Sequence, residues 1–249
     1  MKKLFLTLLC ACTVAGLRAQ GNEWLDPAVN EINRQQMHAT FFAYESADAA
    51  RTGDRTASER FLDLGGTWKF SWVRNADQRP TDFFRPGFND GAWGTMPVPG
   101  LWELNGYGDP QYLNIGYPWR EQFENNPPEV PTAENHVGSY RREIEIPASW
   151  SDKQVIAHFG SVTSNIYLWV NGKFVGYSED SKLEAEFDVT KYVKPGKNLF
   201  AFQVFRWSDG TYLEDQDFFR LSGVGRACYL CAREKRHIAD VRLDAALSE

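Results

Sequence analysis

NIYLWVNGKFVGY, residues 165–177, is the stretch of sequence that decides the fold. The dipeptide Asn171-Gly172 lies between two runs of apolar and aromatic residues, and it is the strongest short-range signal for a two-residue β-hairpin. The two runs predict strands over 165–170 and 174–177. The stretch therefore argues for hairpin-connected β-structure.

Further short strands are predicted on both sides of this hairpin. They cover residues 64–72, 138–146, 155–159 and 199–205. Strands at this spacing with no helix between them indicate an all-β sandwich rather than β-α-β units. The one helix that the pattern supports is short, around residues 29–36.

The segments outside the strands also carry predictions. Residues 20–60 are polar, with few periodic apolar positions, and we expect an extended arm that wraps a domain and is anchored by aromatic residues. These anchors are Trp24, Phe41, Phe42 and Tyr44. Long loops are expected at 77–93, 105–110 and 118–131, and loops of this length in a compact domain are usually functional.

The charge of the chain excludes some partners. The 249 residues carry a net charge of −6, which argues against binding to nucleic acid or to an anionic membrane surface. Lys2 and Lys3 precede an apolar run, Leu4 to Val14, that is too short to span a bilayer. This pattern predicts a signal peptide over residues 1–19.

The predicted signal implies export to the periplasm or the extracellular space. Cys12 lies in a poor lipobox, so lipoprotein anchoring is the disfavoured alternative, and no other stretch is long and apolar enough to span a membrane. Cys228 and Cys231 form a single CxxC without a second one for zinc. We expect buried thiols there, with a disulfide as the other reading.

A second notable stretch is FRWSDGTYLEDQDFFRLSG, residues 205–223. Acids are interleaved with aromatic residues in it. Carboxylates accept hydrogen bonds from sugar hydroxyls, and aromatic rings cover the apolar face of a sugar. Carboxylates also suit a hard metal ion. The structural alternative is a polar, aromatic-lined turn at the edge of a sandwich.

Several motifs in the same order resemble the N-terminal part of glycoside hydrolase family 2 β-galactosidases. They are INRQQMHATFFAY from Ile32, LGGTWKFSW from Leu64, PVPGLWELNGYGDPQYLNIGYPW from Pro97, NPPEVPTAENHVGSYRR from Asn126, WVNGKFVGYSEDSKLEAEFDVT from Trp169 and RWSDGTYLEDQDFFRLSG from Arg206. The resemblance implies a jelly-roll β-sandwich of the galactose-binding-domain type over residues 61–232. An immunoglobulin-like domain and a TIM barrel would follow in the family.

The resemblance also implies where this chain would stop relative to that architecture. Residues 233–249 would be a linker and the start of the missing immunoglobulin-like domain, with a strand beginning at 238–243. After LSG, the chain continues Val224-Gly225-Arg226-Ala227, where the family commonly has an aromatic residue, Arg and Asp. The catalytic glutamates of the family lie on the barrel, so none is expected here.

The resemblance implies two substrate-binding residues. Asn114 matches an asparagine that reaches the galactose pocket, and Asp217 matches an aspartate that contacts the sugar and a sodium ion. A magnesium site would be held by acids at Glu23, Asp26, Glu179 and Asp209. The alternatives are a turn asparagine, a loop aspartate and solvated surface acids.

Together these features predict the sugar-binding portion of an exported β-galactosidase, which depends on Na⁺ and Mg²⁺ when complete. Its partners would be a galactoside substrate and the missing barrel. Whether the protein forms a homo-oligomer is left open. Two alternatives remain: a stand-alone galactoside-binding module, and the same region of a β-glucuronidase or β-mannosidase. The four histidines are scattered without ligand spacing, and His158 is expected to pack within a strand.

Overall fold

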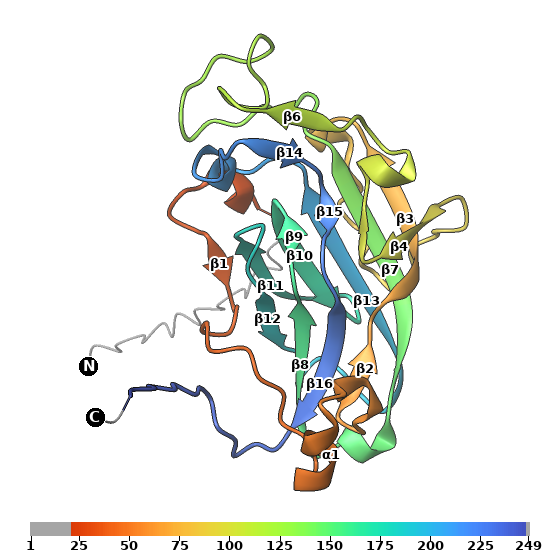
Figure 1. Cartoon of the computed structure of the whole chain (residues 1–249). Coiled ribbons are helices and arrows are strands. Elements are labelled where there is room, and N and C mark those ends of the chain that lie inside the picture. The colour runs from red at the N-terminus through yellow and green to blue at the C-terminus, as the bar shows by residue number, and fades with distance from the viewer. Residues whose placement is uncertain (1–20, 248–249) are drawn as a thin grey trace, which may run out of the picture.

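The computed structural model describes residues 21–247, so the predicted signal peptide at 1–19 lies outside the described residues. Two antiparallel sheets form a sandwich (Figure 1). The larger sheet has the order β1-β11-β10-β13-β7-β3-β4, and the smaller one has the order β12-β8-β16-β2. The predicted all-β sandwich with an N-terminal arm is confirmed.

The strands of the larger sheet are β1 (Glu31–Ile32), β3 (Gly66–Val73), β4 (Gly94–Val98), β7 (Val137–Ile146), β10 (Asn165–Val170), β11 (Lys173–Glu179) and β13 (Gly196–Phe205). Those of the smaller sheet are β2 (Phe61–Asp63), β8 (Gln154–Phe159), β12 (Ala185–Asp188) and β16 (Cys228–Arg233). Two further ribbons pair β6 (Gln111–Leu113) with β14 (Phe218–Arg220), and β5 (Gly100–Leu101) and β9 (Val162–Thr163) with β15 (Gly223–Val224).

Within residues 21–247, helices are few and short. The α-helix α1 covers Ala47–Thr52, and the 3-10 helices are η1 (Glu23–Leu25), η2 (Arg55–Ala57), η3 (Ala76–Gln78), η4 (Glu103–Asn105), η5 (Ala148–Trp150) and η6 (Asp209–Tyr212). The helix predicted around 29–36 is wrong. Residues 31–32 form β1 instead, because their backbone pairs with the edge strand β11 and extends the larger sheet. Sheet pairing overrides the weak helical pattern of this short segment.

The predicted hairpin is confirmed and joins β10 to β11. Val170 pairs with Lys173 across the turn, and Asn171 and Gly172 have φ angles of 50° and 79°. Positive φ at both turn residues is what a type I′ turn requires. The Asn171 amide also accepts from the Leu199 N–H at 2.9 Å and donates to the Tyr192 carbonyl at 2.9 Å. The turn is therefore tied to the next strand, β13.

The larger sheet has a hydrophobic cluster on each face. Leu168 and Phe202 belong to the cluster between the two sheets, whereas Tyr167 and Trp169 belong to a second cluster on the outer face. Loop residues such as Phe83 and Trp119 cover that outer face. All six residues of β10 are consequently buried, which explains the nearly continuous apolar run in the sequence.

The N-terminal arm is anchored on the outer face of the larger sheet. Trp24 is buried and stacks on Phe205, with ring centroids 4.9 Å apart. Phe41, Phe42 and Tyr44 are only half-buried, so Trp24 is the main aromatic anchor of the arm.

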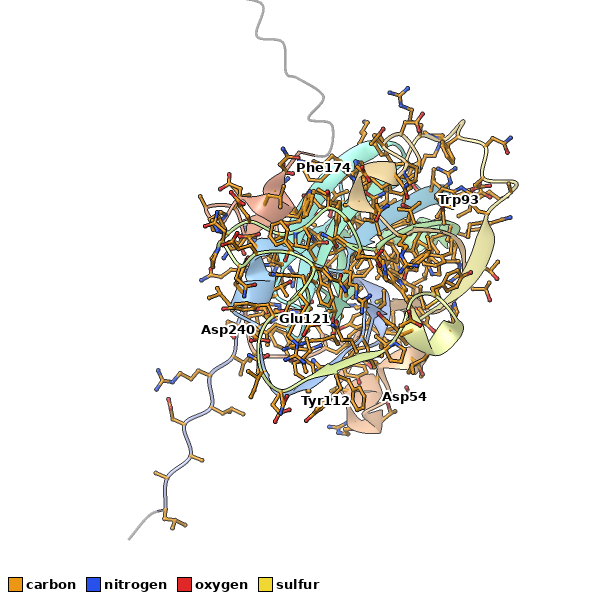
Figure 2. The ribbon with its side chains drawn as sticks, turned by 90° about the horizontal axis from the view of Figure 1, so that it is seen from above. Asp54, Trp93, Tyr112, Glu121, Phe174 and Asp240 are labelled. Carbon is orange, nitrogen blue, oxygen red and sulfur yellow. The ribbon has the colours of Figure 1, made fainter. Side chains whose placement is uncertain are left out.

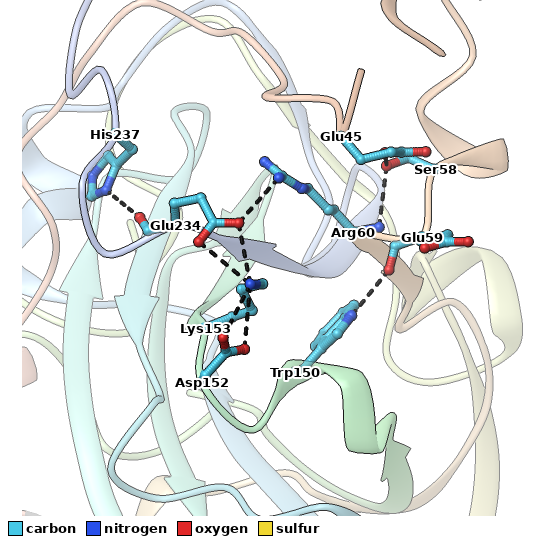
Figure 3. A network of polar contacts seen from close by, with 9 residues as sticks. All are labelled: Glu45, Ser58, Glu59, Arg60, Trp150, Asp152, Lys153, Glu234 and His237. Atoms are coloured by element: carbon cyan, nitrogen blue, oxygen red, sulfur yellow. Dashed lines mark hydrogen bonds and ion pairs between the residues drawn. The ribbon is translucent and has the colours of Figure 1, made fainter.

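The end of the arm meets the start of β8 and the residues after β16 in a polar network (Figure 3). The Glu234 carboxylate accepts from Arg60 at 3.2 Å and pairs with Lys153 at 3.2 Å. The Trp150 indole N–H donates to the Glu59 carbonyl at 3.0 Å. The strand expected at 238–243 is wrong, because these residues are irregular and exposed, with no strand to pair with among the described residues.

Cys228 and Cys231 are free thiols, as expected. Cys228 is buried and Cys231 is half-buried on β16. Burial raises the pKa of each thiol to about 12. Both cysteines are therefore protonated and unreactive at neutral pH.

Candidate functional site

The β6–β14 ribbon carries the two predicted sugar-binding residues. It lies at the end of the sandwich opposite α1, at the top of Figure 1. Leu113 pairs with Phe218, so Asn114 follows β6 at the point where Asp217 precedes β14. Both side chains are exposed. The antiparallel register thus brings together two residues that are about a hundred positions apart in the sequence.

Tyr112 supports the carboxylate of Asp217. Its hydroxyl donates to Asp217 Oδ1 at 2.5 Å, and this hydrogen bond, with the negative charge of Asp217, raises the pKa of Tyr112. Figure 2 looks onto this end from above and labels Tyr112 on the ribbon and Glu121 on the following loop. Tyr112 was not among the predicted site residues, although it lies on β6 only two residues before Asn114.

Several large apolar side chains on the ribbon and in the segments next to it are exposed. The rings of Tyr112 and Phe219 meet edge to face with centroids 5.3 Å apart, and both are more than half exposed. Ile115 and Leu213 are 73% and 87% exposed. Large exposed apolar side chains that lie next to each other, as Tyr112 and Phe219 do, are typical of a contact surface for another protein region or for a ligand.

Arg220 fixes the shape of the turn that presents Asp217. Its buried guanidinium donates to Asp215 at 2.5 Å and to the carbonyls of Glu214 and Gln216 at 2.8 Å. Charge-assisted bonds of this kind hold a loop more firmly than neutral ones. The arginine lies three residues after Asp217 in the sequence, but its inward orientation could not be inferred from that spacing.

The four acids of the 205–223 stretch do not form one cluster. Glu214 accepts from the Ser181 N–H at 2.7 Å, and Asp215 binds Arg220. Asp217 reaches the exposed ribbon, while Asp209 faces Glu179. The acidic, aromatic-rich composition therefore marks two places, the ribbon and an inner acidic pair.

The inner acidic pair joins the end of β11 to the start of η6. Burial, followed by the nearby Asp209, raises the pKa of Glu179 to about 9, against the lowering effect of the hydrogen bond that Tyr177 donates to Glu179 Oε1. Burial also raises the pKa of Asp209. The structure thus places Glu179 and Asp209 side by side in surroundings that disfavour two negative charges.

The other two predicted magnesium ligands lie nearby without completing a shell. Glu23 Oε2 accepts from the Tyr167 hydroxyl at 3.1 Å, and η1, which Glu23 begins, contacts η6. Asp26 is close enough to raise the pKa of Asp209 by repulsion. Across residues 21–247, no three acid, His or Cys side chains are grouped closely enough to hold a metal ion.

Two observations nevertheless fit a cation at the inner pair. Asp209 Oδ1 is buried and has no hydrogen-bond partner. Gly210 leaves room beside Glu179, because a Cβ at this position would come within 2.8 Å of Glu179 Oε2. A hard divalent ion would use the unpartnered oxygen and neutralise the pair. Asp217, by contrast, belongs to no group of three or more His, Cys, Asp or Glu side chains among residues 21–247.

The two antiparallel sheets, with an exposed ribbon at one end, define the chain as a β-sandwich domain. The family model "Glycosyl hydrolases family 2, sugar binding domain" matches residues 61–233, and the chain belongs to this family.

Curated relatives are β-galactosidases. The chain is 43% identical over 226 residues to one from Priestia megaterium and 38% identical over 216 residues to one from Streptococcus thermophilus. These matches cover 90% and 87% of this chain but 22% and 21% of the relatives. The chain therefore spans about a fifth of the length of these relatives.

Solved structures share the fold. The match to a Bacteroides uniformis β-glucuronidase covers 70% of this chain and 18% of the β-glucuronidase chain, with a TM-score of 0.53 and 20% identity. The match to a β-glucuronidase from an uncultured Clostridium covers 70% of this chain and 29% of the β-glucuronidase chain, with a TM-score of 0.51 and 24% identity. Within residues 21–247, no helix has the length and apolar character needed to cross a membrane.

Proposed function

We propose that this chain is the N-terminal sugar-binding portion of an exported β-galactosidase that hydrolyses terminal β-D-galactosides. The observation that carries the proposal is the β6–β14 ribbon, where Asn114 and Asp217 lie together and apolar side chains are exposed. The names of the relatives support galactosides as substrates. Asn114 and Asp217 would bind sugar hydroxyls as donor and acceptor.

The catalytic step would take place outside the described residues. Retaining glycosidases need two carboxyl groups about 5 Å apart, one as nucleophile and one as acid and base. In this proposal a barrel in the same polypeptide supplies both groups and covers the apolar surface of the ribbon. Asp217 would share a sodium ion with that barrel. Glu179 and Asp209, with Asp26 and Glu23 nearby, would hold a magnesium ion that stabilises the join between the arm and the sandwich.

The test compares the complete enzyme with this chain alone. We expect the complete enzyme to hydrolyse an aryl β-galactoside far faster than an aryl β-glucuronide or β-mannoside, and this chain alone to hydrolyse none of them. Preference for the glucuronide or mannoside would replace the proposal with that sister specificity. Turnover by this chain that is abolished by mutating one of its acids would show that the active site is here.

The alternative of a stand-alone module makes a different prediction. In a module, the ribbon alone would bind galactose tightly, so calorimetry would give micromolar affinity that is lost in Asp217→Asn. In our proposal much of the pocket is contributed by the barrel, and the burial that gives a ligand its affinity is missing from this chain. We therefore expect the ribbon of this chain to bind galactose only weakly.

Export is part of the proposal and is testable by itself. The basic residues and the apolar run at the N-terminus support a signal peptide that is cleaved after Ala19. Mass spectrometry of the secreted protein should then find an N-terminus at Gln20. A mature N-terminus at a lipid-modified Cys12 would support a lipoprotein instead.

A further inference from the structure

The sequence contains two Asn-Gly dipeptides, Asn105-Gly106 and Asn171-Gly172. Asparagine before glycine is prone to deamidation, because glycine has no side chain to shield its backbone nitrogen. That nitrogen attacks the asparagine side chain and closes a five-membered ring. The attack depends on how firmly the fold holds both groups, and the two dipeptides are held very differently.

Asn171 is held in place by the hairpin turn and by the strand beside it. Its side-chain oxygen accepts from the Leu199 N–H at 2.9 Å. Its amide nitrogen donates to the Tyr192 carbonyl at 2.9 Å and to Asn198 Oδ1 at 2.8 Å. Both ends of the amide are therefore occupied, and ring closure at this site requires these three hydrogen bonds to break.

Asn105 lies at the exposed end of η4 and has weaker restraints. Leu104, Asn105 and Gly106 are exposed in succession. The side-chain amide of Asn105 donates to the Leu101 carbonyl at 2.8 Å. This hydrogen bond holds the nitrogen that leaves in deamidation, but it leaves the side-chain carbonyl carbon open to attack.

The attacking nitrogen is also less restrained than its counterparts. Within residues 21–247, each of the other five 3-10 helices ends with a C-cap N–H that donates to a carbonyl of the same helix. The Gly106 N–H, in the C-cap position of η4, makes no such bond. A backbone nitrogen without this bond has no helix hydrogen bond to lose when it attacks.

The end of η4 can move while its beginning stays anchored. Glu103 is buried, and its Oε2 accepts from the Ser222 N–H at 2.8 Å. The exposed residues after Glu103 belong to a single short turn. Short 3-10 turns have poor hydrogen-bond geometry, and local opening of such exposed segments costs little free energy. The geometry needed for ring closure is therefore accessible without unfolding of the sandwich.

We propose that Asn105 is a site of spontaneous deamidation, whereas Asn171 is protected by the fold. The Gly106 nitrogen forms a bond to Asn105 Cγ and gives its proton to water. The Cγ–Nδ2 bond breaks, and ammonia leaves with a proton taken from water. Water then opens the succinimide ring at either carbonyl, which gives aspartate or isoaspartate at position 105. The net reaction consumes one water and releases one ammonia, with no oxidation or reduction.

Isoaspartate would change the loop that leads to β6, because it adds one carbon to the main chain before Gly106. The Tyr107 N–H donates to the Trp102 carbonyl at 3.0 Å, and the Tyr107 ring packs edge to face on Phe70 with centroids 4.9 Å apart. An extra main-chain atom inside the turn that this hydrogen bond closes should weaken the bond. The Tyr107 amide should therefore exchange faster with solvent in the aged protein.

Peptide mapping by mass spectrometry tests the proposal. This chain is incubated in its folded state at pH 8 in H₂¹⁸O, so that deamidation during the incubation introduces labelled oxygen. We expect conversion at Asn105 to be at least about tenfold faster than at Asn171, because three hydrogen bonds must break at the second site. In guanidinium chloride, where the fold is lost, the two sites should convert at similar rates.

Two variants provide the controls. In Asn105→Gln, ring closure needs a six-membered ring and is much slower, so the label should disappear from position 105 and the Tyr107 amide should exchange at the same rate before and after ageing. Asn89→Gln changes another exposed asparagine, which precedes Asp90 rather than glycine. This variant should leave the labelling of position 105 unchanged.

Two outcomes would overturn the proposal. Equal rates at the two sites in the folded chain, or faster conversion at Asn171, would show that the fold does not protect the hairpin turn selectively. No conversion at Asn105 during a period in which the unfolded chain converts fully would show that η4 protects its own end. The proposal does not depend on the galactosidase activity of the complete enzyme, so the two proposals fail independently.

Discussion

At the scale of single residues, Asp217 tests the role of the ribbon. In the complete enzyme, Asp217→Asn keeps the size of the side chain but removes its charge. A charge-assisted hydrogen bond contributes about 1.5–3 kcal/mol, so kcat/KM should fall at least about tenfold. The sodium dependence of the rate should also weaken. Steady-state kinetics across sodium concentrations measures both effects.

The control for Asp217 is a remote aspartate on the surface. Asp82→Asn, in an exposed loop position away from the ribbon, should leave both quantities unchanged. If Asp217→Asn has an unaltered sodium response and an efficiency within about twofold of the parent, its role is confined to structure. Thermal melting of each variant establishes that the comparison is between folded proteins.

The Glu179–Asp209 pair predicts an unusual pH dependence. The folded-state pKa of Glu179 is raised to about 9, so between its unfolded value of 4.5 and about 9 the folded state binds more protons than the unfolded state. Stability must therefore fall as the pH rises through this window. Added Mg²⁺ should raise Tm more at pH 8 than at pH 5.5. At pH 8 the Glu179–Asp209 pair more readily loses its shared proton, and the ion would then neutralise the pair in place of that proton.

Glu179→Gln provides the matched variant for the acidic pair. The amide removes the charge repulsion, so without Mg²⁺ the variant should melt at a higher temperature than the parent at pH 8. It should also gain less from Mg²⁺. Glu234→Gln, in the exposed network of Figure 3, serves as the control and should respond to Mg²⁺ like the parent. An equal Mg²⁺ response in all three proteins would show that the ion binds elsewhere.

At the scale of elements, the Glu186 carboxylate links a histidine of the arm to a histidine of the smaller sheet. Glu186 on β12 contacts His38 of the arm at 3.1 Å and His158 of β8 at 2.9 Å. Burial alone would lower the pKa of His38, but the Ala39 carbonyl and Glu186 outweigh it and raise the pKa. Burial opposes ionisation of Glu186, yet the two histidines lower its pKa.

These shifts define a pH window for the attachment of the arm. The contribution of His38 is present below its unfolded pKa of 6.5 and is lost as the pH rises through its higher folded value. The contribution of Glu186 is lost as the pH falls below 4.5 through its lower folded value. Amide hydrogen exchange in residues 37–41 should therefore be slowest near pH 5–6 after correction for the intrinsic rate.

Other charged groups near His38 provide the controls for this window. Glu184 accepts from Thr40 at 3.1 Å, Asp240 accepts from the Ala39 N–H at 2.9 Å, and Arg233 opposes protonation of His38. Glu186→Gln should flatten the pH profile of exchange, while Glu184→Gln should leave its shape intact. An unchanged profile in Glu186→Gln would show that another group controls the arm.

The elements also show what the sequence could predict. Strands such as β7 and β10, and the hairpin after Val170, follow from local patterns because each has a strong propensity or a specific turn dipeptide. β1 was predicted as helix, since its strand conformation comes from pairing with β11, more than 140 residues away. The meeting of Asn114 and Asp217 was implied by resemblance, whereas the hydrogen bonds from β13 that distinguish Asn171 from Asn105 have no local signature.

At the scale of the whole molecule, hydrophobic clusters cover both faces of the larger sheet, so truncating a buried side chain on either face should lower the free energy of unfolding. Leu168 and Trp169 are adjacent in β10 and nearly inaccessible to solvent, but they belong to different clusters. Leu168→Ala should cost about 2–5 kcal/mol and Trp169→Ala about 3–5 kcal/mol of unfolding free energy. Urea denaturation measures both values.

The exposed Lys173 at the end of the same hairpin is the matched control for these substitutions. Lys173→Ala should change the unfolding free energy by less than about 0.5 kcal/mol. If Trp169→Ala were as mild as Lys173→Ala, the loop layer would be only a loose cover over the sheet. A large cost for Trp169→Ala would show that the loop layer packs tightly against the larger sheet.

The loop layer has a practical consequence for engineering this protein. Affinity tags and fused reporters are usually inserted into long surface loops, because such loops tolerate extra residues. Here the loops around Phe83 and Trp119 form one wall of a hydrophobic cluster, so an insertion there would open that wall. The turn at Gly53–Asp54, where exposed residues follow α1 (Figure 2 labels Asp54), is the better place for a label.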